Sequence, residues 1–513
     1  MKIKSLRLKN FRGYNGEIFI DFDDLTAFVG KNDIGKSSIL EALDIFFNDG
    51  KGVIKLDKDD VNIEAQANQL NEISIAICFC ELPNRVVIDT TNETTLSSEY
   101  LLNSDGYFEV VKKYQNGGSA KVFIRALHPT NQECSDLLFR KDTDLRRLIE
   151  EKNITCEDRT NNAIMRTAIW QHYHNDLQLS RIDIDVTKGD IKSKWEKLQK
   201  YLPLYFLFQS DRRNSDGDSE VQDPLKEAVR EILNDEELQQ TLNTVATTVE
   251  TKLREVSSHT LEKLREMSPD IANTLNPVIP SASSLKWADV FKNVSITSDD
   301  DIPINKRGSG CKRLILLNFF RAEVERRQNV YNATSVIYAI EEPETSQHSE
   351  NQKKLIRALR ELSRADNTQV IITTHSVTIV KNLNFCNLRV IRMVEDQKVV
   401  ENTIPNQLPY PSLNEVNYIA FSEISEEYHD ELYGYIVEQR WLSEYKQGKD
   451  TVNYVRLMPD ESTRNEQLTM TEYIRNQIHH PENTHNNRFN ENDLGSSINL
   501  LRTFIQSKQM INL

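Results

Sequence analysis

The chain has 513 residues, of which 38% are hydrophobic and 27% charged, and its formal net charge is -15. Single cores rarely exceed about 250 residues, so we expect several domains. No apolar run approaches the roughly 20 residues of a membrane span, and the first residues show no secretory signal. We therefore expect a soluble cytoplasmic protein. The acidic excess means that nucleic acid would need a local basic patch, and scattered cysteines without CxxC spacing argue against zinc and disulfides.

The first 95 residues show the alternation of apolar and polar side chains that is typical of strands. We expect one sheet from the segments 2–8, 17–22, 25–29 and 73–79. A helix is predicted to begin at Lys36, because apolar residues recur along one stripe. These residues are Ile39, Leu40, Leu43 and Phe46.

Helix-forming, highly charged sequence fills residues 141–300, including 224–233 and 238–267, and predicts a helical insertion with at most a short coiled-coil arm. After it, strands at 335–340 and 369–374 enclose a helix at 351–364, which is the pattern of an α/β sheet. Beyond a proline-rich linker, aromatic-rich helices are expected to the end of the chain.

A phosphate-binding loop is indicated by residues 30–37, GKNDIGKS, which follow an apolar strand ending at Val29 and open a helix. The glycines let backbone N–H groups surround phosphates, Lys36 brings a positive charge to the terminal phosphates, and Ser37 offers a hydroxyl to Mg²⁺. The expected ligands are therefore ATP and Mg²⁺. The remaining residues of the predicted nucleotide site are Asn32, Gly35 and Ser38.

Two successive carboxylates end the apolar strand that begins at residue 335. Buried carboxylates are costly without a partner, so the pair indicates a metal and a catalytic role. We assign Glu341 to the Mg²⁺ shell and Glu342 to positioning the attacking water. The alternative is a solvated strand end.

These motifs together resemble those of OLD-type ATPases, a branch of the RecF/SMC-like ABC ATPases. The resemblance covers roughly residues 1–400 and rests on Phe11-Arg12-Gly13, the loop with Asn32, Gly308-Ser309-Gly310, Ile340-Glu341-Glu342-Pro343-Glu344 and Thr373-Thr374-His375-Ser376. It implies that nucleotide lies between two protomers, with Ser309 and Gly310 completing the partner's γ-phosphate site. It also implies that His375 senses the γ-phosphate. Glu341 departs from the commoner aspartate of ABC proteins, and the Gly-Ser-Gly turn is shorter than the full ABC signature.

The resemblance predicts an α/β fold with an ABC-type P-loop ATPase head and a mainly α C-terminal domain. We expect the head in residues 1–140 and 301–404, the insertion in 141–300 and the C-terminal domain in 411–513. The Toprim nuclease that follows the head in OLD nucleases is expected to be absent, because Glu395 lacks the following glycine. The polar turn at 208–214 is interpreted as a connector, with a nucleotide-sensing or nucleic-acid contact as the alternative.

The C-terminal segment contains an Arg-Asn-x-x-x-His arrangement from Arg475 to His480. It resembles the active motif of HEPN ribonucleases, whose paired helices bring Arg and His to one phosphate. These residue types suit metal-independent RNA cleavage, because Arg binds phosphate through two hydrogen bonds and His can transfer a proton near neutral pH. Glu427 and His429 are expected on a neighbouring helix that could orient the site. The alternative is a helix end capped by His479 and His480 that is structural or forms a docking surface.

The function favoured by the sequence is that of an OLD-like or Septu-type ATPase of bacterial anti-phage defence with slow turnover. Its nucleotide state would control a nuclease, either in its own C-terminal domain or in an HNH or Toprim partner subunit acting on RNA or phage DNA. We expect a homodimer or higher even oligomer through the ATP sites. The alternative is a RecF-like repair ATPase, which the acidic charge disfavours. A scaffold with a vestigial site is disfavoured by the intact Lys36, Ser37 and Glu342.

Overall fold

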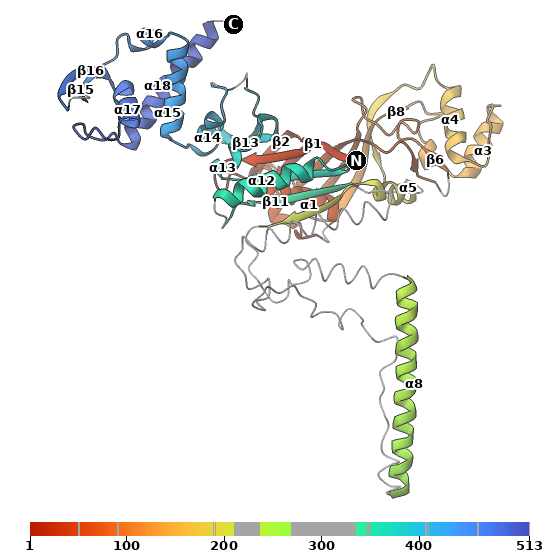
Figure 1. Cartoon of the computed structure of the whole chain (residues 1–513). Coiled ribbons are helices and arrows are strands. Elements are labelled where there is room, and N and C mark those ends of the chain that lie inside the picture. Colours follow the sequence, from red (N-terminus) through yellow and green to blue (C-terminus); the bar gives the residue numbers. More distant parts are fainter. Residues whose placement is uncertain are drawn as a thin grey trace. The chain divides into compact units, whose positions relative to one another are not determined.

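The computed structural model describes residues 1–49, 52–89, 92–187, 189, 191–209, 236–267, 335–345, 349–405, 408, 410–458 and 461–511. Contacts divide the chain into two compact units, one formed by Met1–Ser210 with Arg327–Leu513 and the other by Asp211–Arg326. Figure 1 labels the elements along the chain. Within the described ranges, no helix combines the length and the apolar character needed to cross a lipid bilayer.

The first sheet is antiparallel and has the strand order β2-β1-β4-β7-β8-β9. Its strands are β1 (Lys2–Phe11), β2 (Tyr14–Asp21), β4 (Glu72–Cys80), β7 (Phe108–Gln115), β8 (Ala120–His128) and β9 (Ser180–Asp185). Alternation is clear in β8, where Val122, Ile124 and Ala126 are buried and their neighbours are more exposed. Such a pattern is typical of a sheet with one face on the core.

The second sheet has the order β10-β11-β12-β3-β13-β14, and all neighbouring strands are parallel except the last pair. Its strands are β3 (Leu25–Val29), β10 (Leu204–Phe208), β11 (Val336–Glu341), β12 (Thr368–Thr374), β13 (Leu388–Val394) and β14 (Gln397–Asn402). Every residue of β3, β11 and β12 is buried, as expected for parallel strands covered on both faces. The predicted α/β class is confirmed.

Helix α1 (Lys36–Asn48) packs against β10, β11 and β12, and α12 (Ser349–Ser363) packs against β12 and β3. The predicted apolar stripe of α1 is confirmed, since all four of its residues are 0% exposed. One hydrophobic cluster joins α1 to both sheets. The expectation of a single sheet for the first 95 residues is wrong, because β3 leaves its neighbours in sequence and pairs with β12 and β13. A strand that is buried at every residue needs cover on two faces, which the parallel sheet provides.

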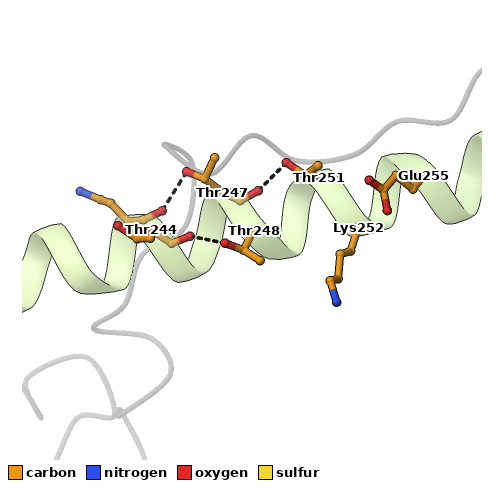
Figure 2. A pocket seen from close by; sticks show the side chains of 7 residues that line it. Thr244, Thr247, Thr248, Thr251, Lys252 and Glu255 are labelled. Atoms are coloured by element: carbon orange, nitrogen blue, oxygen red, sulfur yellow. Dashed lines mark hydrogen bonds between the residues drawn. The ribbon is translucent and has the colours of Figure 1, made fainter.

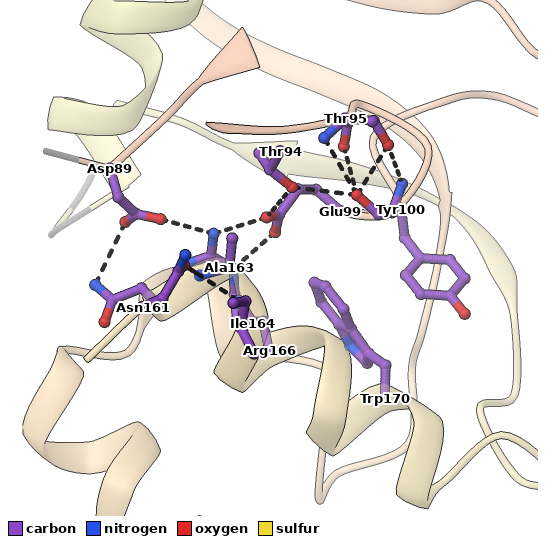
Figure 3. Close-up of polar contacts among 12 residues, drawn as sticks. Asp89, Thr94, Thr95, Glu99, Tyr100, Asn161, Ala163, Ile164, Arg166 and Trp170 are labelled. Carbon is purple, nitrogen blue, oxygen red and sulfur yellow. Dashed lines mark hydrogen bonds and ion pairs between the residues drawn. The ribbon is translucent and has the colours of Figure 1, made fainter. Parts of the chain in front are cut away.

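Short elements fill the connections between the strands up to β10. They are α2 (Ile63–Ala67), β5 (Val86–Val87), β6 (Glu93–Thr94), α3 (Asp142–Glu151), α4 (Asn162–His172) and α5 (Ile191–Leu198), with short 3-10 helices at Lys58–Asp60, Leu137–Phe139 and Gln199–Tyr201. Residues 141–209 thus supply strands β9 and β10 as well as helices. Arg166 of α4 is buried and binds Glu99 at 2.7 Å and 2.8 Å and Asp89 at 2.8 Å, which ties the helix to the segment around β6 (Figure 3).

In the second unit the structure describes helix α8 (Glu236–Met267), which confirms the helix predicted at 238–267. The helix predicted at 224–233 lies outside the described residues. Four threonine hydroxyls of α8 donate to the carbonyl four residues earlier, at 2.8–2.9 Å, so they are satisfied within the helix itself. These are Thr244, Thr247, Thr248 and Thr251, which help to line a pocket on α8, and Figure 2 shows their side chains.

Between β12 and β13 lie α13 (Val377–Val380) and a 3-10 helix at Phe385–Asn387. After the second sheet the chain is mainly helical, and its elements are α14 (Leu413–Phe421), α15 (Glu426–Glu438), α16 (Leu442–Lys446), β15 (Thr451–Leu457), β16 (Thr463–Thr469), α17 (Met470–His479) and α18 (Glu491–Ile511). Helices α15, α17 and α18 pack on one another around a cluster that includes Leu432, Ile474 and Ile498. The antiparallel hairpin β15–β16 was not predicted, because most of its residues are exposed and its apolar periodicity is weak.

Candidate active site

The loop between β3 and α1 turns sharply through glycine. Gly35 precedes the helix with φ 109° and ψ 15°, in the left-handed region that favours glycine. A Cβ at this position would lie 3.0 Å from the hydroxyl oxygen of Tyr14, which donates a hydrogen bond to the Gly35 carbonyl at 3.0 Å. No side chain caps the start of α1, and its first turn carries no acidic residue, so its first N–H groups can serve an anion.

Lys36 lies inside this loop. Its ammonium donates to the carbonyls of Gly30 and Lys31, both at 2.9 Å, and the residue is 5% exposed. Burial lowers the pKa of Lys36, and the negative charges of Glu342, Glu344 and Asp33 offset this only in part. An ammonium held in the loop by two carbonyls is a charge that terminal phosphates can bind. Asn32 and Ser37 are exposed, and Ser38 is half-buried.

The two predicted carboxylates end β11 beside β12. Glu341 is 7% exposed and pairs in register with Thr373. Glu342 has a left-handed φ of 39°, which is uncommon for a residue other than glycine, and its N–H donates to the Thr373 carbonyl at 3.1 Å. The chain therefore turns abruptly between the two residues. A buried carboxylate followed by a turned, half-exposed one can serve two different roles.

His375 lies between two carboxylates. Its Nδ1 is 3.2 Å from Glu342 Oε1 and 3.5 Å from Glu344 Oε1. Glu344 is 4% exposed, and its Oε1 also accepts hydrogen bonds from the Thr374 hydroxyl at 2.7 Å and the His375 N–H at 2.9 Å. Glu344 therefore holds the end of β12 that carries the histidine. Sequence reasoning quoted Glu344 within the motif and assigned it no role.

The parallel sheet brings these groups to one edge. Val29 at the end of β3 pairs with Thr374 at the end of β12, and Glu341 ends the next strand. The carboxyl ends of parallel strands share an edge, so the loop of Lys36, the two carboxylates and His375 lie together. Gln209 directly follows β10 at this edge and donates to Glu41 of α1 at 3.2 Å.

The chemistry of these side chains fits Mg²⁺, which takes few protein carboxylates and completes its shell with phosphate and water. Ser37 and Glu341 would offer the oxygen ligands for such an ion. Among the described residues, no group of three or more His, Cys, Asp or Glu side chains is arranged to hold a metal alone. Ser309 and Gly310 lie outside the described residues.

The C-terminal residues Arg475 and His480 contact different carboxylates. Arg475 stacks over the Tyr433 ring, and its Nε is 3.7 Å from Asp430 Oδ1. His480 is the C-cap of α17, and its Nδ1 lies 3.2 Å from Glu482 Oε1. Within one chain, the structure therefore does not bring Arg475 and His480 to a common carboxylate.

His479 shares Asp430 with Arg475, since its Nε2 lies 2.6 Å from Asp430 Oδ1. The four-residue spacing of Arg475 and His479 places them on one face of α17. The predicted neighbours differ in exposure, because Glu427 is exposed whereas His429 is 0% exposed and contacts the Ser497 hydroxyl at 2.9 Å. Burial lowers the pKa of His429 to about 4, so it belongs to the interior.

Comparison with known proteins places this site in context. A family model described as an AAA ATPase domain matches residues 1–380. An OLD nuclease of Thermus scotoductus is 25% identical over 406 residues, which cover 78% of this chain and 63% of that protein. The chain thus spans less than two thirds of the length of this relative.

Two solved structures of SMC heads are also similar. The SMC head domain from Thermotoga maritima has a TM-score of 0.32 at 13% identity and covers 79% of this chain and 100% of its own. The Smc head with an extended coiled coil bound to the C-terminal domain of ScpA, from Pyrococcus furiosus, has a TM-score of 0.33 at 13% identity, with coverage of 78% and 95%. Both scores are too low to carry an argument about this chain.

Proposed function

Because the chain belongs to the AAA ATPase domain family, we propose that this ATPase is Mg²⁺-dependent and of the ABC type, and that its nucleotide state controls a nuclease in anti-phage defence. The observation that carries the hydrolytic part is the gathering of Lys36, Glu342 and His375 at one sheet edge. The defence part is supported by the motifs shared with OLD-type ATPases and by the similarity to an OLD nuclease.

Each residue has a physical role in this proposal. Lys36 binds the terminal phosphates, and Glu342 orients the attacking water and accepts its proton. His375, held between two carboxylates, contacts the γ-phosphate and so reports whether it is present. Ser37 and Glu341 would hold Mg²⁺, which would neutralise charge on the phosphate oxygens.

We propose that a second protomer completes the site. Asn32 and Ser37, which the loop offers to nucleotide, are exposed on the single chain. A second chain would cover them and exclude water, and Ser309 with Gly310 would supply its contact to the γ-phosphate. Control of a nuclease would then follow from nucleotide-dependent dimerisation.

The hydrolytic role is tested by three variants of the full chain. Lys36→Ala should weaken ATP binding by at least about tenfold, because charge-assisted hydrogen bonds contribute about 1.5–3 kcal/mol. Glu342→Gln should bind ATP, lose turnover and accumulate as a dimer in light scattering. Lys121→Ala, an exposed lysine of β8 outside the loop, is the control and should behave as wild type. Unchanged hydrolysis in both Lys36→Ala and Glu342→Gln would refute the proposal.

We propose the C-terminal domain as one location of the nuclease and a separate HNH or Toprim subunit as the other. The internal location is supported by Arg475 and His479, which lie on one exposed face beside Asp430. RNA cleavage and toxicity should be lost in Arg475→Ala. Both should be kept in the control Arg440→Ala, which removes a different, exposed arginine of the C-terminal domain. ATP binding should be unchanged in both variants. Cleavage that survives Arg475→Ala and requires a co-expressed nuclease would place the activity in the partner.

A RecF-like repair ATPase is the second candidate function. It predicts that duplex ends or gaps stimulate hydrolysis and that binding weakens steeply with salt. The net charge of -15 favours the defence proposal over this one. Stimulation of the wild-type ATPase by undamaged linear duplex, without any nuclease activity in cells or extracts, would reverse that preference.

A further inference from the structure

The hairpin β13–β14 extends past the sheet edge beside the phosphate-binding loop. Strand β13 pairs with β3 as far as Val390 and Val29, and continues to Val394 while β3 turns into the loop. The contact is close, since a Cβ at Gly30 would lie 2.7 Å from the Ile391 carbonyl oxygen. The hairpin then reverses at two residues with φ of 47° and 62°, so β14 returns along the same edge.

Lys398 on β14 lies directly against the loop region. Its Nζ is 5.8 Å from the centroid of the Tyr14 ring, and a Cβ on Gly13 would overlap it. Tyr14 in turn packs against Gly35 through its ring and hydroxyl. Strands β14 and β2 contact each other along this region. The Tyr14 ring therefore contacts both the Lys398 ammonium and Gly35, the residue that precedes α1.

Among the residues that the structure describes, Lys398 has no carboxylate within ion-pair distance and no hydrogen-bond acceptor. Its neighbour on the hairpin, Arg392, instead binds Glu401 through two bonds of 2.7 Å. Burial lowers the pKa of Lys398, and the negative charge of Asp33 in the loop offsets this in part. A half-buried ammonium loses part of its hydration, and a bound anion would compensate for this loss. The phosphate chain of a nucleotide is the anion that this edge is built to receive.

We propose that Lys398 is a second phosphate-contacting lysine of the nucleotide site, carried to the loop by the hairpin rather than by the loop itself. The proposal rests on the proposed function, because it requires that nucleotide binds at Lys36. It assigns to β13–β14 the role of one wall of the site on the side of Gly13 and Asp33. The alternative is that Lys398 has only a structural role and holds Tyr14 and Asp33 in position.

Nucleotide affinity of the full chain distinguishes the two readings. Lys398→Met retains most of the stem and removes the charge, so it should raise the Kd for ATP and for ADP by roughly tenfold, the usual effect of a charge-assisted hydrogen bond. Lys398→Arg should stay close to wild type. Lys121→Met, an exposed lysine of β8, is the matched control. The salt dependence of ATP binding should become weaker in Lys398→Met alone.

A wild-type Kd for ATP in Lys398→Met overturns the proposal, even if its melting temperature falls, because a structural role predicts that result. A measurement on the wild-type chain removes the risk of misfolding: saturating ATP should slow acetylation of Lys398 several-fold and leave Lys121 unchanged, by peptide mass spectrometry. Equal acetylation with and without ATP overturns the proposal. If the wild-type chain binds no ATP at all, the proposed function fails first, and Lys36→Ala will then match wild type.

Discussion

Replacing Glu344 with alanine should slow ATP hydrolysis while leaving ATP binding intact, because Glu344 holds the strand end that carries His375. Its Oε1 accepts hydrogen bonds of 2.7 Å from the Thr374 hydroxyl and 2.9 Å from the His375 N–H. Glu344 is 4% exposed and Thr374 0%, so water cannot easily replace the lost acceptor. Each unsatisfied buried donor costs about 1–3 kcal/mol.

Two such donors cost about 2 kcal/mol at the lower limit, and the strand end can regain their bonds only by moving His375. A loss of about 1.4–2.8 kcal/mol in transition-state stabilisation lowers kcat by about 10- to 100-fold. Steady-state hydrolysis at saturating MgATP measures this loss, and competition binding measures the Kd for ATP. Glu344→Gln keeps an acceptor oxygen and should recover most of kcat. Equal kcat in the Ala and Gln variants, or wild-type kcat in the Ala variant, would contradict this reasoning.

Three further predictions concern stability and the loop. Arg166→Leu leaves two buried carboxylates without their cation and should lower the free energy of unfolding in urea by about 3–5 kcal/mol. Arg85→Leu, from an exposed ion pair, should leave the urea midpoint close to that of wild type, and similar losses in the two variants would count against a buried role for Arg166. The pKa of His429 is lowered from 6.5 to about 4 in the folded chain, so its stabilisation is complete above pH 6.5 and is lost as the pH falls toward 4. The loss should reach about 3 kcal/mol, and His429→Asn should unfold with a smaller dependence on pH over that range. Tyr14→Phe removes the hydroxyl bonded to Gly35 and keeps the ring, so the KM for ATP should rise by no more than about tenfold, and a larger rise would show that the hydroxyl does more than brace the loop.

Local patterns predicted much of the catalytic head. The helix after the loop was predicted because its buried residues recur at helical spacing, and β11 and β12 were predicted because short apolar runs bounded by polar residues are typical of buried parallel strands. The phosphate-binding loop around Lys36 could be predicted because the spacing of its glycines and its place between a strand and a helix are properties of one short stretch of sequence. Weakly patterned elements were missed, as in the exposed hairpin β15–β16.

By itself, the sequence determined which chemical groups the head carries, because residue types and their order are local properties: a lysine in a glycine loop, two carboxylates after one strand and a histidine after the next. Only the tertiary structure decided which groups meet, since the sheet order joins strands that are hundreds of residues apart. It made Glu344 the acceptor that holds His375, and it brought Lys398 beside Tyr14. It also paired Arg475 with His479 through Asp430, because helical spacing and the facing helix α15, rather than motif spacing, determine side-chain partners.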